Sequence, residues 1–99
     1  MDALLRAART PAAHGAVWNL GAERAYSLLD FVSILNELCG VEFETVPFPE
    51  DRKIIDIGDY YGDHSAFTNA TGWQPTIDLA EGLERTIKSY RDHAKIYWA

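Results

Sequence analysis

The sequence has few of the features that define several large classes of protein. It has a single cysteine, Cys39, so it can form no internal disulfide and no cysteine-based metal site. No apolar run approaches the ~20 residues that span a bilayer. The first ten residues, MDALLRAART, lack the order of a signal peptide, in which an apolar region follows a positive one. We therefore expect a cytoplasmic protein with no membrane partner.

Positive charge is also scarce. Nine lysines and arginines stand against fifteen aspartates and glutamates, which gives a formal net charge of −6. Nucleic acids attract basic surfaces, so no nucleic-acid partner is expected. A content of 47% hydrophobic and 24% charged residues is typical of a globular chain. Its 99 residues, with no long linker, predict a single domain over residues 1–99 with a small core.

The strongest helix signal begins at Ser27. Its hydroxyl can accept a hydrogen bond from the backbone of Asp30, whose carboxylate can return the bond, as in a capping box. Gly40 predicts a left-handed end to this helix. The apolar residues between them recur at helical spacing: Leu28, Phe31, Val32, Leu35 and Leu38.

Three further helices are expected. The first covers Asp2–Arg9. A short one covers His64–Thr71, with Asp63 as its N-cap and Gly72 at its end, so that the next residue, Trp73, folds back on the helix.

The last of these helices starts after Asp78, which forms a second cap with Glu81. Gly82 lies inside it and costs up to ~1 kcal/mol relative to alanine. We therefore expect this glycine to pack closely against another backbone.

Two stretches show the alternation of side-chain character along the chain that is typical of β-strands. Ala16–Leu20 ends at Gly21, and Val41–Val46 follows the helix that starts at Ser27. Strand, helix and strand in this order predict a right-handed crossover. The expected fold is thus α/β, a small, mostly parallel sheet of short strands flanked by three to four helices.

The chain is organised around residues 51–75, DRKIIDIGDYYGDHSAFTNATGWQP. Arg52 and Lys53 place two cations beside an apolar run, and Asp56 follows three residues later. Paired cations suit an anion such as a phosphate, while a nearby carboxylate suits sugar hydroxyls. The alternative is that these charges are only the solvated surface of an acidic domain.

Other site chemistry finds little support. His64 with Asp59 or Asp63 does not have the spacing of a recognised metal site, so no metal is expected. No serine lies in the sequence context of a nucleophile elbow. The sequence therefore offers no candidate catalytic residue and no candidate metal-binding residue.

Several motifs now occur in a recognisable order. They are WNLG at residues 18–21, the capped helix at Ser27, RKIIDIGDYYGDHS at 52–65, GWQP at 72–75 and EGLERTI at 81–87. From about residue 4 to residue 90 the sequence resembles the C-terminal lobe of NAD-dependent nucleotide-sugar epimerases and dehydratases, the extended short-chain dehydrogenase/reductase family. Each motif alone is only a local structural signal, whereas their order and spacing together carry the resemblance.

The resemblance implies a substrate-binding lobe. In that family this lobe closes over a nucleotide-sugar, here of the UDP or dTDP type, while a Rossmann lobe holds NAD. By the same resemblance, Arg52 or Lys53 neutralises the diphosphate and Asp56 accepts hydrogen bonds from ribose hydroxyls. The motif departs from the family pattern in two places: Ile55 stands where a glycine is usual, and Ala66 stands where a lysine is common.

The catalytic half of such an enzyme is missing from these residues. No tyrosine has a lysine four positions later, and no glycines have dinucleotide-binding spacing. We therefore expect the chain to be part of an NAD-dependent enzyme by resemblance, yet to bind no cofactor and to be catalytically silent alone. The alternative is a stand-alone interaction or assembly module that keeps the fold without the ligand.

An isolated lobe of this kind should expose an apolar face. We expect a partner Rossmann lobe or, more simply, a homodimer to cover that face. The C-terminal helix and its aromatic end, Ile96–Trp98, are expected at or near the dimer contact.

Overall fold

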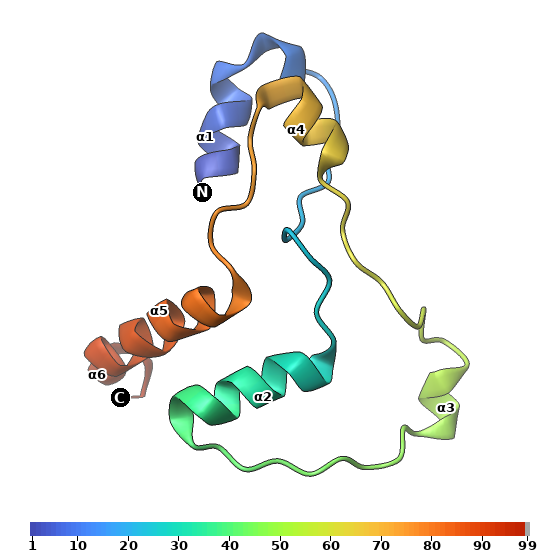
Figure 1. Cartoon of the computed structure of the whole chain (residues 1–99), viewed down its shortest axis with the longest axis vertical. Coiled ribbons are helices and arrows are strands. Elements are labelled where there is room, and N and C mark those ends of the chain that lie inside the picture. Colours follow the sequence, from blue (N-terminus) through green and yellow to red (C-terminus); the bar gives the residue numbers. More distant parts are fainter. Residues whose placement is uncertain (99) are drawn as a thin grey trace. The chain divides into compact units, whose positions relative to one another are not determined.

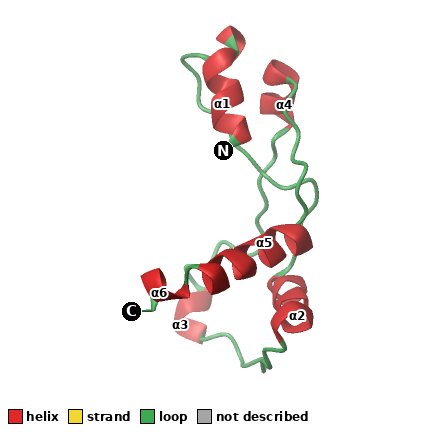
Figure 2. Ribbon diagram, turned by 90° about the vertical axis from the view of Figure 1, so that its left-hand side faces the viewer, coloured by secondary structure: helices red, strands yellow, loops and turns green. Residues whose placement is uncertain are grey.

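Helices and loops alone make up the part of the chain that the structure describes, residues 1–98 (Figure 2). In this computed structural model the elements follow one another along the chain as shown in Figure 1. In order they are α1 (Asp2–Arg9), the 3-10 helix η1 (Pro11–Ala13), α2 (Leu28–Cys39), α3 (Glu50–Lys53), α4 (Ser65–Thr71), α5 (Leu79–Asp92) and α6 (Ala94–Tyr97). None of these helices is long and apolar enough to cross a membrane.

The predicted parallel sheet is wrong, since no strand forms among residues 1–98. Both predicted strands, Ala16–Leu20 and Val41–Val46, lie in loops, and neither takes part in a backbone–backbone hydrogen bond within the described chain. Alternation marks a segment that is able to form a strand. A strand exists only when another strand satisfies its N–H and C=O groups, and the described residues supply none.

The chain forms two compact units, each assembled from two separate stretches. Unit 1 consists of Met1–Ala25 and Ile57–Thr76. Unit 2 consists of Tyr26–Asp56 and the chain from Ile77 onward. The single domain over residues 1–99 stays a prediction.

Unit 1 has a small core centred on one aromatic ring. Phe67 of α4 is only 2% exposed and packs with the buried Ala3 of α1 and Ala13 of η1. Trp18 and Trp73 flank it, with ring centroids 6.0 and 5.7 Å from that of Phe67. Burying such a side chain contributes about 1.5–3 kcal/mol. Figure 1 shows α1 and α4 beside each other in this unit, and η1 contacts both of these helices.

The ends of α4 follow the sequence closely. The helix begins at Ser65, one residue later than predicted, so its N-cap is His64 and the prediction of Asp63 as N-cap is wrong by one residue. Asp63 still accepts a hydrogen bond from the Ser65 backbone N–H at 2.8 Å. Gly72 ends it with φ 71° and ψ 8°, which is the expected left-handed conformation. Trp73 then folds back on Phe67, so this turn is confirmed.

In unit 2, α2 and α5 pack against each other. The capping box that begins α2 is confirmed, because the Asp30 N–H donates to Ser27 Oγ at 3.0 Å and the Ser27 N–H donates to Asp30 Oδ2 at 2.8 Å. Gly40 ends α2 in the left-handed conformation, with φ 66°. The inward stripes are half-buried; they include Phe31, Val32, Leu35 and Leu38 on α2 and Leu79, Leu83 and Ile87 on α5.

The start of α5 is also confirmed, while the prediction for its glycine is wrong. Asp78 accepts a hydrogen bond from the Glu81 N–H at 2.8 Å. A Cβ on Gly82 would meet only the side chain of Ile77, at 3.8 Å, which is ordinary van der Waals contact. Within residues 1–98 no backbone of another segment approaches Gly82 closely, so this glycine destabilises the helix without the expected close packing.

Candidate functional site

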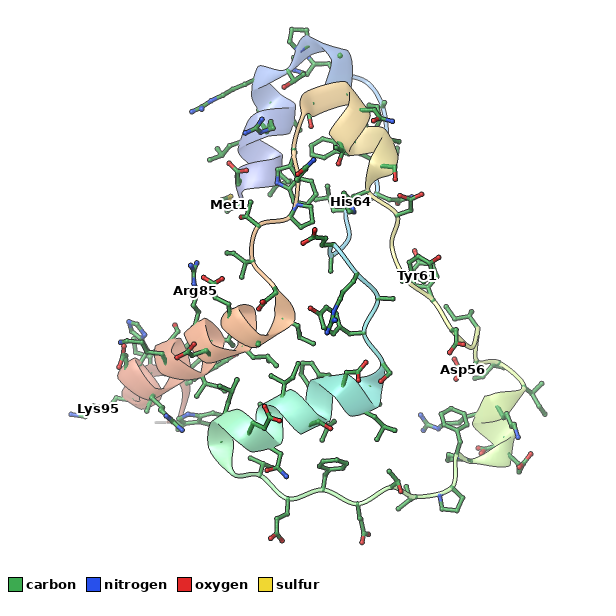
Figure 3. The ribbon with its side chains drawn as sticks, in the orientation of Figure 1. Met1, Asp56, Tyr61, His64, Arg85 and Lys95 are labelled. Carbon is green, nitrogen blue, oxygen red and sulfur yellow. The ribbon has the colours of Figure 1, made fainter. Side chains whose placement is uncertain are left out.

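The three predicted ligand residues lie together in unit 2. Arg52 and Lys53 form the last turn of α3, and the chain turns back at once, since the Asp56 N–H donates to the Arg52 carbonyl at 3.1 Å. Figure 3 shows Asp56 just beyond α3. One tight turn therefore carries two cations and a carboxylate.

Both cations on α3 are available to an anion. Lys53 Nζ lies 3.9 Å from Glu50 Oε1, but these side chains are 68% and 88% exposed, so the pair contributes little. The Arg52 side chain forms no hydrogen bond or ion pair with any other residue in the described part of the chain. The turn can thus offer positive charge to a ligand without first breaking a strong internal contact.

The apolar run around this turn is exposed, contrary to its buried appearance in the sequence. Every residue from 40 to 61 is exposed, and Ile54 is 86% exposed. We call residues 40–61 the exposed stretch. Its large apolar members are Val41, Phe43, Val46, Phe48, Ile54, Ile55, Ile57, Tyr60 and Tyr61. A patch of this kind usually marks a surface that another chain or domain covers.

A separate cavity of about 190 Å³ lies in unit 1. Five residues line it: Glu23, His64, Thr68, Gln74 and Pro75. None of these was among the site residues predicted from the sequence. Four of the five lie within residues 64–75, inside the stretch around which the chain is organised, and only Glu23 is distant in the sequence.

A close crossing of two loops shapes this cavity. A Cβ on Gly21 would lie 2.3 Å from the Gly62 carbonyl oxygen, and a Cβ on Gly62 would lie 2.7 Å from the Leu20 carbonyl oxygen. Only glycine permits such an approach of two backbones. The crossing lies two residues before Glu23 and two residues before His64, so it positions two walls of the cavity.

The remaining wall is held by α4 and the turn after it. Thr68 Oγ1 donates to the Trp73 carbonyl at 2.7 Å, which fixes the backbone just before Gln74. The His64 ring meets the Trp73 ring edge-on, with centroids 5.8 Å apart. Figure 3 shows His64 at the beginning of α4. The cavity is therefore built directly on the aromatic core of unit 1.

Asp63 serves α4 instead of a ligand. The hydroxyl and the backbone N–H of Ser65 both donate to its carboxylate, and these bonds hold the pKa of Asp63 below its ordinary value of 3.8. In the part of the chain that is described, no three histidine, cysteine, aspartate or glutamate side chains are grouped to hold a metal ion.

The sequence is similar to that of several dTDP-glucose 4,6-dehydratases. The protein of this name from Streptomyces griseus is 33% identical over 94 residues, which are 95% of this chain and 28% of that protein. The one from an Actinoplanes species is 31% identical over 77 residues, 78% of this chain and 24% of the relative. The one from Streptomyces antibioticus is 32% identical over 90 residues, 91% of this chain and 26% of the relative.

No family model and no solved structure matches the chain. The relatives nevertheless define its class, a nucleotide-sugar dehydratase-related domain. These relatives are members of the NAD-dependent epimerase/dehydratase family, which is the family that the motifs of this chain resemble. The chain spans about a quarter of the length of the relatives it matches, in agreement with one lobe of such an enzyme.

Proposed function

We propose that this chain is the nucleotide-sugar-binding lobe of an epimerase or dehydratase. In this proposal Arg52 or Lys53 neutralises the diphosphate, and Asp56 accepts hydrogen bonds from ribose hydroxyls. The observation that carries it is the tight turn after α3, which presents both cations to solvent beside a carboxylate. A diphosphate needs charge-assisted donors, and a sugar needs acceptors beside them.

The proposal includes catalytic silence of the isolated chain. The chain has no tyrosine–lysine pair at the family spacing and no dinucleotide-binding glycines, so the NAD of the family would be bound by another lobe. The isolated protein should therefore show no saturable binding of NAD in calorimetry. It should likewise leave dTDP-glucose unchanged during prolonged incubation.

The anion site is tested by titrating dTDP-glucose and UDP-glucose into the wild type and into the double variant Arg52→Ala/Lys53→Ala. Losing two charge-assisted contacts should weaken binding by about tenfold or more and reduce its dependence on salt. The matched control is Lys88→Ala/Arg91→Ala on α5, which removes the same net charge elsewhere. Equal affinities in the two double variants would assign Arg52 and Lys53 to the solvated surface.

The exposed stretch supports the need for a further lobe. Its apolar side chains are uncovered in the described chain, and the relatives have about three-quarters of their length outside the match. A Rossmann lobe, within a longer chain or as a separate partner, would cover these apolar side chains.

A homodimer is the second way to cover apolar surface. The C-terminal aromatic residues stack on α5, with Tyr97 and Trp98 ring centroids 4.9 and 6.4 Å from that of Tyr90. Ile96 and Trp98 nevertheless stay largely exposed. If a second copy covers them, light scattering will give a dimer mass, and removing residues 96–99 will raise the dissociation constant. A monomer mass at high concentration would show that this end only folds back on its own helix.

A further inference from the structure

The cavity of unit 1 contains hydrogen-bonding groups that the fold does not use. The side chains of Glu23 and Gln74 and the ring nitrogens of His64 form no hydrogen bond with any other residue in the described chain. Thr68 donates its hydroxyl proton to Trp73, which leaves the lone pairs of its oxygen available. Four polar side chains, two from α4 and its N-cap and two from the loops at Glu23 and Gln74, thus line one small space without hydrogen bonds to one another.

The mixture of donors and acceptors defines the ligand chemistry. Glu23 only accepts, whereas the amide of Gln74 both donates and accepts and the ring of His64 carries at least one N–H donor. A hydroxyl group also donates and accepts, so a molecule with several hydroxyls can satisfy all of these groups at once. An anion would be repelled by Glu23, and an ammonium ion would leave the amide and ring N–H donors unused.

Size sets a second limit. A volume of about 190 Å³ is below the ~300–1,000 Å³ that is typical of sites for drug-sized ligands. It exceeds by several-fold the ~30 Å³ that one water occupies in the liquid. The space therefore suits a small ring or a short polyol. Pro75 adds an apolar surface for the C–H face of such a ring.

The cavity is also pre-formed. The crossing of Gly21 and Gly62 positions Glu23 and His64, and the Thr68–Trp73 bond fixes the approach to Gln74. All of these contacts lie within unit 1 and rest on the Phe67 core. Little loop ordering is then required when a ligand binds, and the side chains that must still be ordered are those of the exposed Glu23 and Gln74.

We propose that this cavity is a binding site for a small neutral polyol, such as a single free sugar ring, separate from the Arg52–Lys53 turn. Glu23, His64 and Gln74 supply the hydrogen bonds, and Pro75 supplies the apolar contact. The site goes beyond the proposed nucleotide-sugar function. A free sugar carries no phosphate, so its binding does not depend on the cations of unit 2.

The test is an NMR titration of isotope-labelled protein with D-glucose. Saturable chemical-shift changes are expected at Glu23, His64, Thr68 and Gln74, with a dissociation constant in the millimolar range, about −4 kcal/mol. The variant Glu23→Ala/Gln74→Ala should weaken binding about tenfold. The variant Glu84→Gln, on the exposed surface of α5, should bind as the wild type does. Because neither Glu23 nor Gln74 has a partner in the fold, Phe67 resonances should be unchanged in the double variant.

Three results would overturn the proposal. One is the absence of saturable shifts with glucose, and a second is equal affinity in the wild type and the double variant. A third is a titration at matched ionic strength in which methylammonium chloride shifts the resonances of these residues and glucose does not. That result would make the cavity a cation site. Binding of dTDP-glucose through Arg52 and Lys53 is measured in a separate titration. A negative result for glucose in the cavity therefore does not affect the test of the nucleotide-sugar site, and the reverse is also true.

Discussion

Phe67 and Ile54 are both large apolar side chains, and their surroundings differ completely. Phe67 is 2% exposed, enclosed by two tryptophan rings and two alanines of unit 1. Ile54 is 86% exposed, in a stretch of 22 consecutive exposed residues, 40–61. The cluster around Phe67 is completed by neighbours from the same unit, whereas the exposed stretch has no such neighbours within residues 1–98. An apolar sequence therefore does not by itself guarantee a core.

The two regions also differ in whether they need a partner: the Phe67 cluster is self-contained, and the exposed stretch depends on another lobe or chain. The aromatic cluster positions the cavity of unit 1 without help from another chain. The exposed stretch carries the proposed diphosphate site, so full order and affinity there should require the cover that the remainder of such an enzyme provides. Mutations in the two regions test this difference.

The largest expected effect is that of removing the core ring. Phe67→Ala should reduce the free energy of unfolding by about 3–5 kcal/mol, because it leaves a cavity between Trp18 and Trp73. The matched control is Phe48→Ala in the exposed stretch, which should change stability by less than about 0.5 kcal/mol. Urea denaturation followed by tryptophan fluorescence measures both. Equal losses of unfolding free energy for Phe67→Ala and Phe48→Ala would contradict the difference between the core and the exposed stretch.

A smaller effect is expected at the loop crossing. Gly21→Ala places a Cβ 2.3 Å from the Gly62 carbonyl oxygen, so the loops must separate, at a cost of about 1–3 kcal/mol. Gly82→Ala should instead stabilise by up to ~1 kcal/mol, since its Cβ meets only ordinary contact and a helix favours alanine. Thermal melts of the two variants should therefore move in opposite directions. A melting temperature for Gly21→Ala at or above that of the wild type would argue against the crossing.

The smallest effect concerns the Asp63 carboxylate, which lies just before the His64 N-cap of α4. The hydroxyl and N–H of Ser65 hold the pKa of Asp63 below its ordinary 3.8 only in the folded chain. The folded pKa is thus the lower one, so the stability from these bonds is complete above the ordinary pKa and is lost as pH falls through the folded value. Ser65→Ala should raise the pKa of Asp63 in a carbon-detected NMR titration. An unchanged pKa would mean that the hydroxyl contributes nothing.

The sequence alone determined both ends of α2, the start of α5 and the end of α4. It did not predict η1, α3 or α6. The Ser27–Asp30 capping box, the Asp78 cap, and the glycines at 40 and 72 all act through hydrogen bonds and backbone angles within a few residues. Such interactions need no distant partner, so the sequence specifies them fully. The motifs that carry the family relationship were readable in the same way, and so was the presence of Arg52, Lys53 and Asp56 near one another.

Only the tertiary structure decided the rest. The sheet was predicted from alternation, yet a ladder needs a second strand, and the described residues offer none to Ala16–Leu20 or Val41–Val46. The crossing of Gly21 with Gly62, and with it the cavity from Glu23 to Pro75, joins residues far apart in the chain. No local pattern encodes such a meeting, because it depends on how loops are placed by the packing around Phe67.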